Sequence, residues 1–292
     1  MSSYAQDVKN ELAHKFVKER ACLRAELVGL LKVGAKKIDG RIEFTSSNAA
    51  VARKVITLAK RFFPAVKPEV AAVRRKTLQK NLRYVVRFIA TNDVQYFFDP
   101  PDIDEVLKRP RFKVAYLRGA FLAKGMVNRP EAEYFLQIET TKAEALFLQE
   151  LMTVLDFNAG FRQRRKVFLA SLRGGDDICD FLGMIGADNA VERFEVARNI
   201  KEVRMQVNRV VNMETASLNR SVDAAQRQLA DIKILIDNNV PVNHYVRDVM
   251  KLRLDNPTAT VGELAEKVSV TRPGLMHHFR TIRNLAEKFR NK

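Results

Sequence analysis

The side chains best placed for chemistry lie near the C-terminal end of the chain, on one side of a predicted helix. They are Thr271, Arg272, Met276, His277 and Arg280, with Asn284 one turn further on. Residues four apart on a helix share a face, so 272, 276 and 280 point the same way. Arginine donates to guanine edges or phosphate, and a threonine at a helix N-terminus suits a phosphate. This pattern predicts non-covalent recognition of a nucleic acid.

A second candidate site comes from two segments of nine residues, 27–35 and 117–125, which begin 90 positions apart. Both are predicted helices, and Gly29 and Gly119 would let them pack closely side by side. The segments resemble the LAGLIDADG motif of homing endonucleases, whose eighth position carries the metal-binding carboxylate. Here those positions are Gly34 and Lys124. Glycine offers no ligand and an ammonium repels a divalent cation, so the scaffold is expected to lack nuclease chemistry.

Other sources of catalytic chemistry are few. A substitute carboxylate could come from Glu26, Asp39 or Glu133, which keeps an active metal-dependent endonuclease open as an alternative. The four histidines do not form a metal-binding spacing, and the chain has neither a Walker loop nor a G-x-G-x-x-G segment. We therefore expect no catalytic residues, no metal, no cofactor and no small-molecule substrate.

The elements that would position the two motifs recur along the chain. The periodicity over 21–98 and again over 112–187 predicts the order α-β-β-α-β-β-α. Asp39-Gly40 marks a tight hairpin turn in the first copy, and Thr141 with Glu144 forms a helix capping box in the second. A proline-marked connector separates the copies. The sequence predicts an α+β domain over 21–190 with a pseudo-twofold repeat.

Cations are frequent on the predicted strands of both copies. They are Arg74, Arg75, Arg83 and Arg87 in the first copy and Arg162, Arg164 and Lys166 in the second. The last three lie at i, i+2 and i+4, which predicts one cationic strand face that follows a phosphate backbone. The alternative is a solvated face whose charges discourage edge pairing. Glu43, Glu131, Glu133 and Glu139 on the hairpins are expected to weaken a DNA contact.

The rest of the chain is predicted to be helical. Val8, Leu12 and Phe16 indicate an amphipathic helix over 1–20, and 191–220 is predicted as a mostly helical linker. Residues 221–292 are predicted as an all-α helix-turn-helix domain that begins with a separate helix over 222–238. Its next helix places Val246, Val249, Met250 and Leu254 inward. Thr260 caps the first motif helix near the DNA backbone, and the second buries Leu275, Phe279, Ile282, Ala286 and Phe289. The alternative is a helical hairpin that packs on the N-terminal domain or a protein partner.

Composition supports a polyanionic partner. The 292 residues include 51 Lys and Arg against 34 Asp and Glu, a formal net charge of +17. That excess is spread along the chain and favours nucleic acid over an anionic membrane, with a merely basic soluble protein as the third alternative. Two distant cysteines suit a reducing cytoplasm, and no apolar run is long enough to span a bilayer.

The whole chain is similar to the WhiA family of bacterial transcription regulators tied to sporulation or cell division. The similarity is carried by Arg24–Leu27, Tyr116–Leu122, Asp180–Leu182 and Gln206–Asn212, and it continues over Asn219–Asp231. The resemblance implies a sequence-specific, non-catalytic regulator of double-stranded DNA in the cytoplasm, associated with the nucleoid. RNA polymerase or another transcription regulator is the further partner that the resemblance suggests. The remaining alternative is a scaffold that binds nucleic acid or polymerase without sequence preference.

Overall fold

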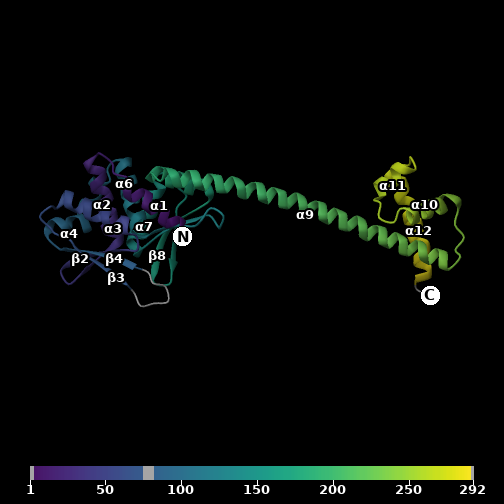
Figure 1. The fold of residues 1–292 in the computed structure, drawn as a ribbon, viewed down its shortest axis with the longest axis horizontal. Helices are drawn as coiled ribbons and strands as arrows, with labels where there is room; N and C mark the ends of the chain where they lie inside the picture. The colour runs from purple at the N-terminus through teal and green to yellow at the C-terminus, as the bar shows by residue number, and fades with distance from the viewer. Residues whose placement is uncertain (1–2, 75–81, 291–292) are drawn as a thin grey trace. The chain divides into compact units, whose positions relative to one another are not determined.

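The computed structural model describes residues 3–74 and 82–290, and the chain divides into two compact units (Figure 1). The first unit is Met1–Glu202 and the second is Val203–Lys292. The first is α+β and the second is helical, which confirms the predicted fold class.

The first unit contains two copies of one element order. The first copy consists of α2 (Arg20–Gly34), β1 (Ala35–Ile38), β2 (Arg41–Ser46), α3 (Ala49–Phe62), β3 (Glu69–Arg74), β4 (Leu82–Ile89) and α4 (Asn92–Phe98). The second consists of α6 (Pro110–Lys124), β5 (Gly125–Val127), β6 (Phe135–Thr140), α7 (Lys142–Thr153), β7 (Gly160–Arg164), β8 (Val167–Arg173) and α8 (Gly175–Ile185). The connector adds an unpredicted short helix, α5 (Ile103–Val106). The predicted pseudo-twofold repeat is confirmed.

Each copy forms an antiparallel sheet within the described residues, with strand orders β1-β2-β4-β3 and β5-β6-β8-β7. Asp39 and Gly40 both have positive φ and make the two-residue turn between β1 and β2, as predicted. Strand alternation puts Ile42 and Phe44 into the core and Arg41 and Glu43 on the opposite face. We call the faces turned away from the core the outer faces of the sheets; helices α2, α3 and α6 lie on the other side (Figure 1).

Helices α2 and α6 pack against each other at the centre of the unit, and two glycines permit the contact. A Cβ atom on Gly29 would overlap the carbonyl oxygen of Tyr116, and one on Gly119 would overlap that of Glu26. The close approach is therefore backbone against backbone, as predicted for the motif glycines. Each helix runs directly into the first strand of its own sheet, so this contact also fixes the spacing of the sheets.

Helix α1 (Tyr4–His14) is shorter than predicted. Val8 and Leu12 are buried, but Phe16 lies beyond the helix end and is 49% exposed. The helix instead holds the start of α9 (Asp188–Asp237), because Glu11 accepts hydrogen bonds from the backbone amides of residues 189 and 190 at 2.8 and 3.1 Å. These bonds satisfy amides that a helix N-terminus leaves free.

Helix α9 is also longer than the helices predicted for this part of the sequence. The predicted linker over 191–220 and the separate helix over 222–238 form one continuous helix. No proline or glycine interrupts residues 188–237, which explains the continuity. Ala225, Ile232 and Leu235 are buried within the second unit, while Val222 and Ile236 are exposed.

The second unit contains three further helices, α10 (His244–Asp255), α11 (Val261–Lys267) and α12 (Arg272–Arg290). Helices α11 and α12 are the two helices of the helix-turn-helix. Val246, Val249 and Met250 are buried as predicted, but Leu254 is 47% exposed. Its neighbour Arg253 is buried instead. The Arg253 guanidinium donates to the carbonyl of Ala259 at 2.6 Å and lies over the Phe279 ring. Burial lowers the pKa of Arg253.

The glycine contact gives a first prediction. Gly29→Ala should destabilise the protein by roughly 3 kcal/mol, because the methyl group meets rigid backbone of α6. The control is Gly183→Ala in α8, where the nearest atom to the new methyl group lies at 3.8 Å. That change should alter the free energy of unfolding in urea by less than about 1 kcal/mol, towards greater stability. Equal effects for the two variants would contradict the backbone contact.

Candidate nucleic-acid interface

Helix α12 presents one buried side and one exposed side. Leu275, Phe279, Ile282 and Ala286 are buried as predicted, whereas Phe289 is only partly buried. The five predicted contact residues are all exposed, and they are Thr271, Arg272, Met276, His277 and Arg280. The structure thus brings them together at the N-terminal half of one helix, where a groove-binding helix would contact base edges.

Both predicted threonines cap a helix of the helix-turn-helix: Thr260 caps α11 and Thr271 caps α12. Thr271 accepts a hydrogen bond from the amide of Gly274 at 3.3 Å. Thr260 and Glu263 form the predicted capping box, with bonds of 3.2 and 2.7 Å. The backbone bond to Thr260 lowers the pKa of Glu263. The Thr260 hydroxyl oxygen accepts in the cap, so its proton and the first amides of α11 remain available as donors there.

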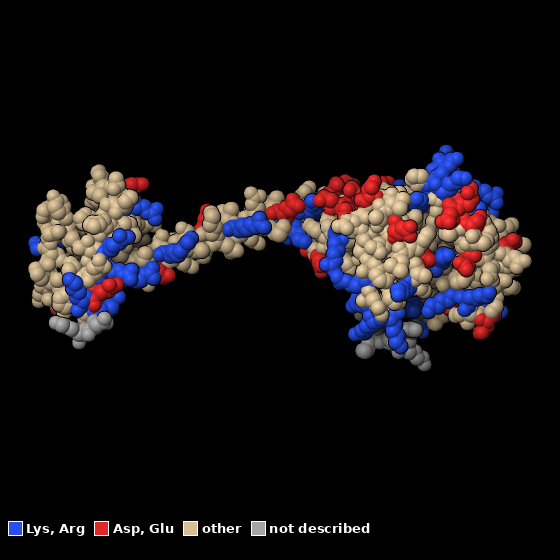
Figure 2. Space-filling view, turned by 180° about the vertical axis from the view of Figure 1, so that it is seen from behind, with Lys and Arg blue, Asp and Glu red and all other residues tan. Residues whose placement is uncertain are grey.

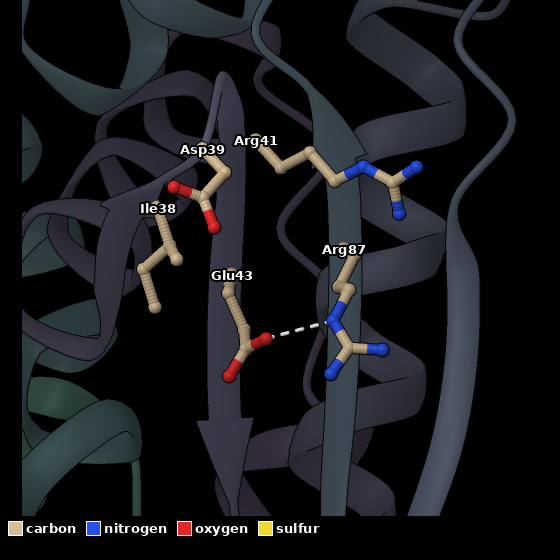
Figure 3. A pocket seen from close by; sticks show the side chains of 5 residues that line it. All are labelled: Ile38, Asp39, Arg41, Glu43 and Arg87. Atoms are coloured by element: carbon tan, nitrogen blue, oxygen red, sulfur yellow. Dashed lines mark hydrogen bonds and ion pairs between the residues drawn. The ribbon is translucent and has the colours of Figure 1, made fainter.

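Cations on the outer face of the first sheet are partly neutralised by carboxylates on the same face. The Arg87 Nε donates to Glu43 at 2.7 Å, and Arg41 pairs with Glu69 at 2.7 Å. Figure 3 shows the Glu43–Arg87 pair beside Asp39 in a hollow of about 350 Å³ next to the β1–β2 turn. Arg87 is therefore a weaker candidate for a phosphate contact than its sequence position predicts.

Arg74 and Arg83 remain exposed on this sheet. Arg74 ends β3 opposite Leu82, and Arg83 lies opposite Val73 on the neighbouring strand. Neither has an ion pair with a residue in the described part of the chain. Arg75, the fourth predicted cation of this copy, lies outside the described residues.

The hairpin of β7 and β8 carries the least neutralised group of cations. Arg162 and Arg164 are exposed on β7, but Lys166 is not on the strand as predicted. It lies in a two-residue turn with Arg165, whose φ of 54° allows the tight reversal. Within residues 3–74 and 82–290, none of the four makes an ion pair. Lys and Arg gather along the side of this unit where Figure 1 places the strands (Figure 2).

The ends of α2 and α6 do not fit a divalent metal ion. Gly34 faces the Phe44 ring and Ala123, so no side chain larger than hydrogen has room there. Lys124 is the last residue of α6 and is exposed as a residue, although nearby protein atoms partly desolvate its ammonium group. Partial burial, together with the charges of Arg83 and Lys36, lowers the Lys124 pKa against the opposing effect of Glu139. A glycine and a lysine supply no oxygen ligands, so we derive no metal-dependent step.

The three candidate substitute acids do not gather at those helix ends. Glu26 is fully buried and pairs with Lys54 at 2.6 Å and Arg118 at 3.5 Å. Asp39 lies in the hairpin turn, and Glu133 is exposed in the loop before β6. Across the described residues, no three His, Cys, Asp or Glu side chains lie close enough together to hold a metal ion.

Sequence reasoning missed Lys9 on α1. Its side chain is 8% exposed, and the buried residues Ala5 and Ala13 lie one turn on either side of it. Burial and repulsion by Lys124 lower the Lys9 pKa to about 8. A lysine within an apolar helical stripe was the available signal.

The fold and these sites define a protein with a degenerate LAGLIDADG-like domain followed by a helix-turn-helix domain. Three family models match: the WhiA N-terminal LAGLIDADG-like domain over 20–97, the WhiA LAGLIDADG-like domain over 113–204, and the WhiA C-terminal HTH domain over 207–286. The chain belongs to the WhiA family. It is 37% identical to the probable cell division protein WhiA of Desulforamulus reducens, over 99% of this chain and 97% of that protein.

A second relative and a crystal structure agree. The probable cell division protein WhiA of Bacillus thuringiensis is 36% identical over 99% of this chain and 98% of its own length. The crystal structure of full-length WhiA from Thermatoga maritima has the same fold, with a TM-score of 0.60 at 21% identity over 99% of both chains. Among the described helices, none is both long enough and apolar enough to cross a membrane.

The buried Glu26 cluster gives a second prediction. Glu26→Gln should cost roughly 3–5 kcal/mol of unfolding free energy, because Lys54 and Arg118 lose their shared counter-charge. Burial already lowers the Lys54 pKa, and Glu26 opposes that shift. Between the lowered Lys54 pKa of the folded variant and the ordinary lysine pKa of the unfolded chain, the unfolded chain binds more protons than the folded one, so the variant should regain stability as pH rises through that range.

The control is Glu105→Gln, because Glu105 forms an exposed pair with Lys108. Its unfolding free energy should change by less than about 1 kcal/mol. A Glu26 variant as stable as this control would contradict the structural role of the cluster.

Proposed function

We propose that this protein is a sequence-specific, non-catalytic regulator of transcription that binds double-stranded DNA. The main support for this proposal is the exposed side of α12, where arginine, histidine and methionine side chains lie near the helix N-terminus. A protruding helix of this composition suits the major groove, where Arg272 and Arg280 can donate to guanine or phosphate.

The LAGLIDADG-like domain would add backbone contacts. Arg162, Arg164, Arg165 and Lys166 form a charged hairpin without internal counter-ions in the described residues. Phosphate contacts of this kind position a protein on DNA without reading its sequence. The same domain is proposed to contact RNA polymerase or a second regulator. This part of the proposal rests on fold and family rather than on residue chemistry.

The biological setting follows from the relatives. They are named probable cell division proteins, and we propose that this chain controls genes of cell division or sporulation. It would act in the cytoplasm at the nucleoid. The proposed function requires no metal, no cofactor and no small-molecule substrate.

Arg272→Ala tests the base-reading role. If Arg272 pairs with a guanine, the variant should bind the selected DNA site more weakly by about 1–3 kcal/mol and should discriminate less at one position. Duplexes selected from a random pool and measured by fluorescence anisotropy give both quantities. Arg247→Ala on α10 has the same charge change at an exposed position outside α12, and it should retain discrimination. Unchanged discrimination in the Arg272 variant would remove this residue from the interface.

Arg164→Ala tests the backbone role. Loss of one phosphate contact should lower the slope of log K against log salt by about 0.9 and weaken binding about eightfold at 0.1 M salt. Selected and random duplexes should be affected equally. A loss restricted to the selected site would instead make Arg164 a sequence-reading residue, and no loss would place the hairpin away from DNA.

A further inference from the structure

Strand β3 is an edge strand with an apolar middle. In the order β1-β2-β4-β3 it pairs with β4 alone among the described residues, so its other side leaves backbone amides and carbonyls without a partner strand. Val70, Ala72 and Val73 are exposed on it. An edge of this kind can pair with another extended chain unless charged side chains or prolines prevent it.

The second repeat shows how the equivalent edge can be protected. Strand β7 takes the place of β3 in the order β5-β6-β8-β7, and it exposes Arg162 and Arg164. Between its terminal residues Glu69 and Arg74, β3 contains valine and alanine only. The two repeats therefore present different edges, and only that of β3 suits the approach of another strand.

The hydrophobic core ends before it reaches β3. Phe44, Val86 and Val70 lie along one row on the core side of the sheet, and Phe44 and Val86 are fully buried. Val70 is 56% exposed, although it belongs to the same row. Helix α3 packs on β2 and β4 on this side of the sheet (Figure 1). The uncovered end of the row is thus an apolar surface beside an open strand edge.

A hollow of about 600 Å³ lies at this place, formed by α3, the connector that follows it and the start of β3. Its apolar lining consists of Ile56, Val66, Val70 and the prolines at 64 and 68. Its polar lining consists of Lys60 and Lys67, which are both exposed.

The two lysines of the hollow have no counter-charge. Within residues 3–74 and 82–290, neither ammonium group forms an ion pair or a hydrogen bond. The adjacent acid, Glu69, belongs to the outer face of the sheet and pairs there with Arg41 at 2.7 Å. The hollow therefore combines an apolar floor with two cations that can accept acidic partners.

We propose that an extended, acidic segment of another protein binds here as an additional strand on β3. Its backbone pairs with the open edge, and one apolar side chain enters the hollow between Ile56 and Val70. Acidic side chains on the same face of the added strand contact Lys60 and Lys67. The main chain supplies most of the contact, and the hollow with its lysines selects the sequence.

The chemistry of the surface favours a peptide over the other polymers that a basic protein meets. Alternating amides and carbonyls along a strand edge match another peptide backbone, and an apolar hollow has no counterpart on a phosphate backbone. A second copy of β3 would bring its own Lys67 and Arg74 to a surface that already has two cations. The proposal deepens the protein-contact part of the proposed function and rests on it, whereas DNA recognition by α12 is independent of it.

The probe is a short, fluorescently labelled synthetic peptide with the sequence Glu-Thr-Val-Thr-Glu at its centre. Strand alternation places its valine and both glutamates on one face. Binding to the full-length protein is measured by fluorescence anisotropy. We expect the parent protein to bind this peptide, and to bind much more weakly a version with lysine in place of glutamate and a version with N-methylated backbone amides.

Two valines of β3 provide a matched pair of variants. Val70→Glu places a carboxylate in the hollow and should weaken peptide binding about tenfold or more. Val73→Glu makes the same change on the same strand, but Val73 lies on the opposite face and should leave the affinity unchanged. Both residues are well exposed, at 56% and 44%, so both variants should keep the thermal midpoint of the parent within a few degrees.

The lysines are tested in the same assay. Lys60→Gln should weaken binding about two- to fivefold, as expected for one exposed ion pair. Lys142→Gln removes an exposed charge from α7 in the second repeat and should have no effect. Hydrogen exchange of the amides in residues 69–74 should slow when the peptide binds, because amides at the open edge gain a partner.

Three results would overturn the proposal. The first is that the parent protein does not bind the acidic peptide, or that the Val70 and Val73 variants bind it equally well. The second is displacement of the peptide by a random DNA duplex whose affinity depends on Lys60, which would make the surface a nucleic-acid contact. The third is a parent protein that sediments as a dimer while Val70→Glu sediments as a monomer, which would assign the edge to a second copy. Base discrimination by Arg272 is measured separately, so each of these results would leave DNA recognition standing.

Discussion

The contact between α2 and α6 is the constraint on which the first unit depends. Gly29 and Gly119 let the two backbones touch, and each helix continues directly into a strand of its own sheet. The distance between the sheets is therefore fixed by a helix contact that tolerates no side chain. The Glu26 carboxylate reinforces it, because it binds Lys54 of α3 and Arg118 of α6 within the core. Lys54 also donates to the carbonyl groups of Leu12 and Lys15, which ties the end of α1 to the same cluster.

The glycine contact holds the LAGLIDADG-like framework together independently of the residues at the helix ends. Gly34 and Lys124 occupy the ends of the paired helices, where neither supplies an oxygen ligand, and the backbone contact is made at Gly29 and Gly119 instead. The Lys124 ammonium repels a divalent cation, which a carboxylate at that position would attract.

Much of this architecture could be predicted from the sequence, because the repeat constrains it twice. Periodicity gave both copies, and Asp39-Gly40 identified one hairpin since both residues tolerate positive φ. The exposed side of α12 followed from spacing alone. The local sequence pattern did not predict side-chain positions that depend on tertiary contacts. Arg253 displaces Leu254 from the core because it finds a carbonyl and an aromatic ring there, and Lys166 falls in a turn since Arg165 adopts positive φ. The cluster around Glu26 joins residues distant in sequence, so no spacing could reveal it.

The most direct test of the account is an assay for cleavage of bound DNA. The full-length protein is held at a concentration that saturates its selected duplex, Mg²⁺ is added, and the strands are separated on a denaturing gel over time. The account predicts intact strands, because the ends of α2 and α6 carry no carboxylate that could hold the ion. Strand breaks that accompany the purified chain and disappear on chelation of Mg²⁺ would contradict it.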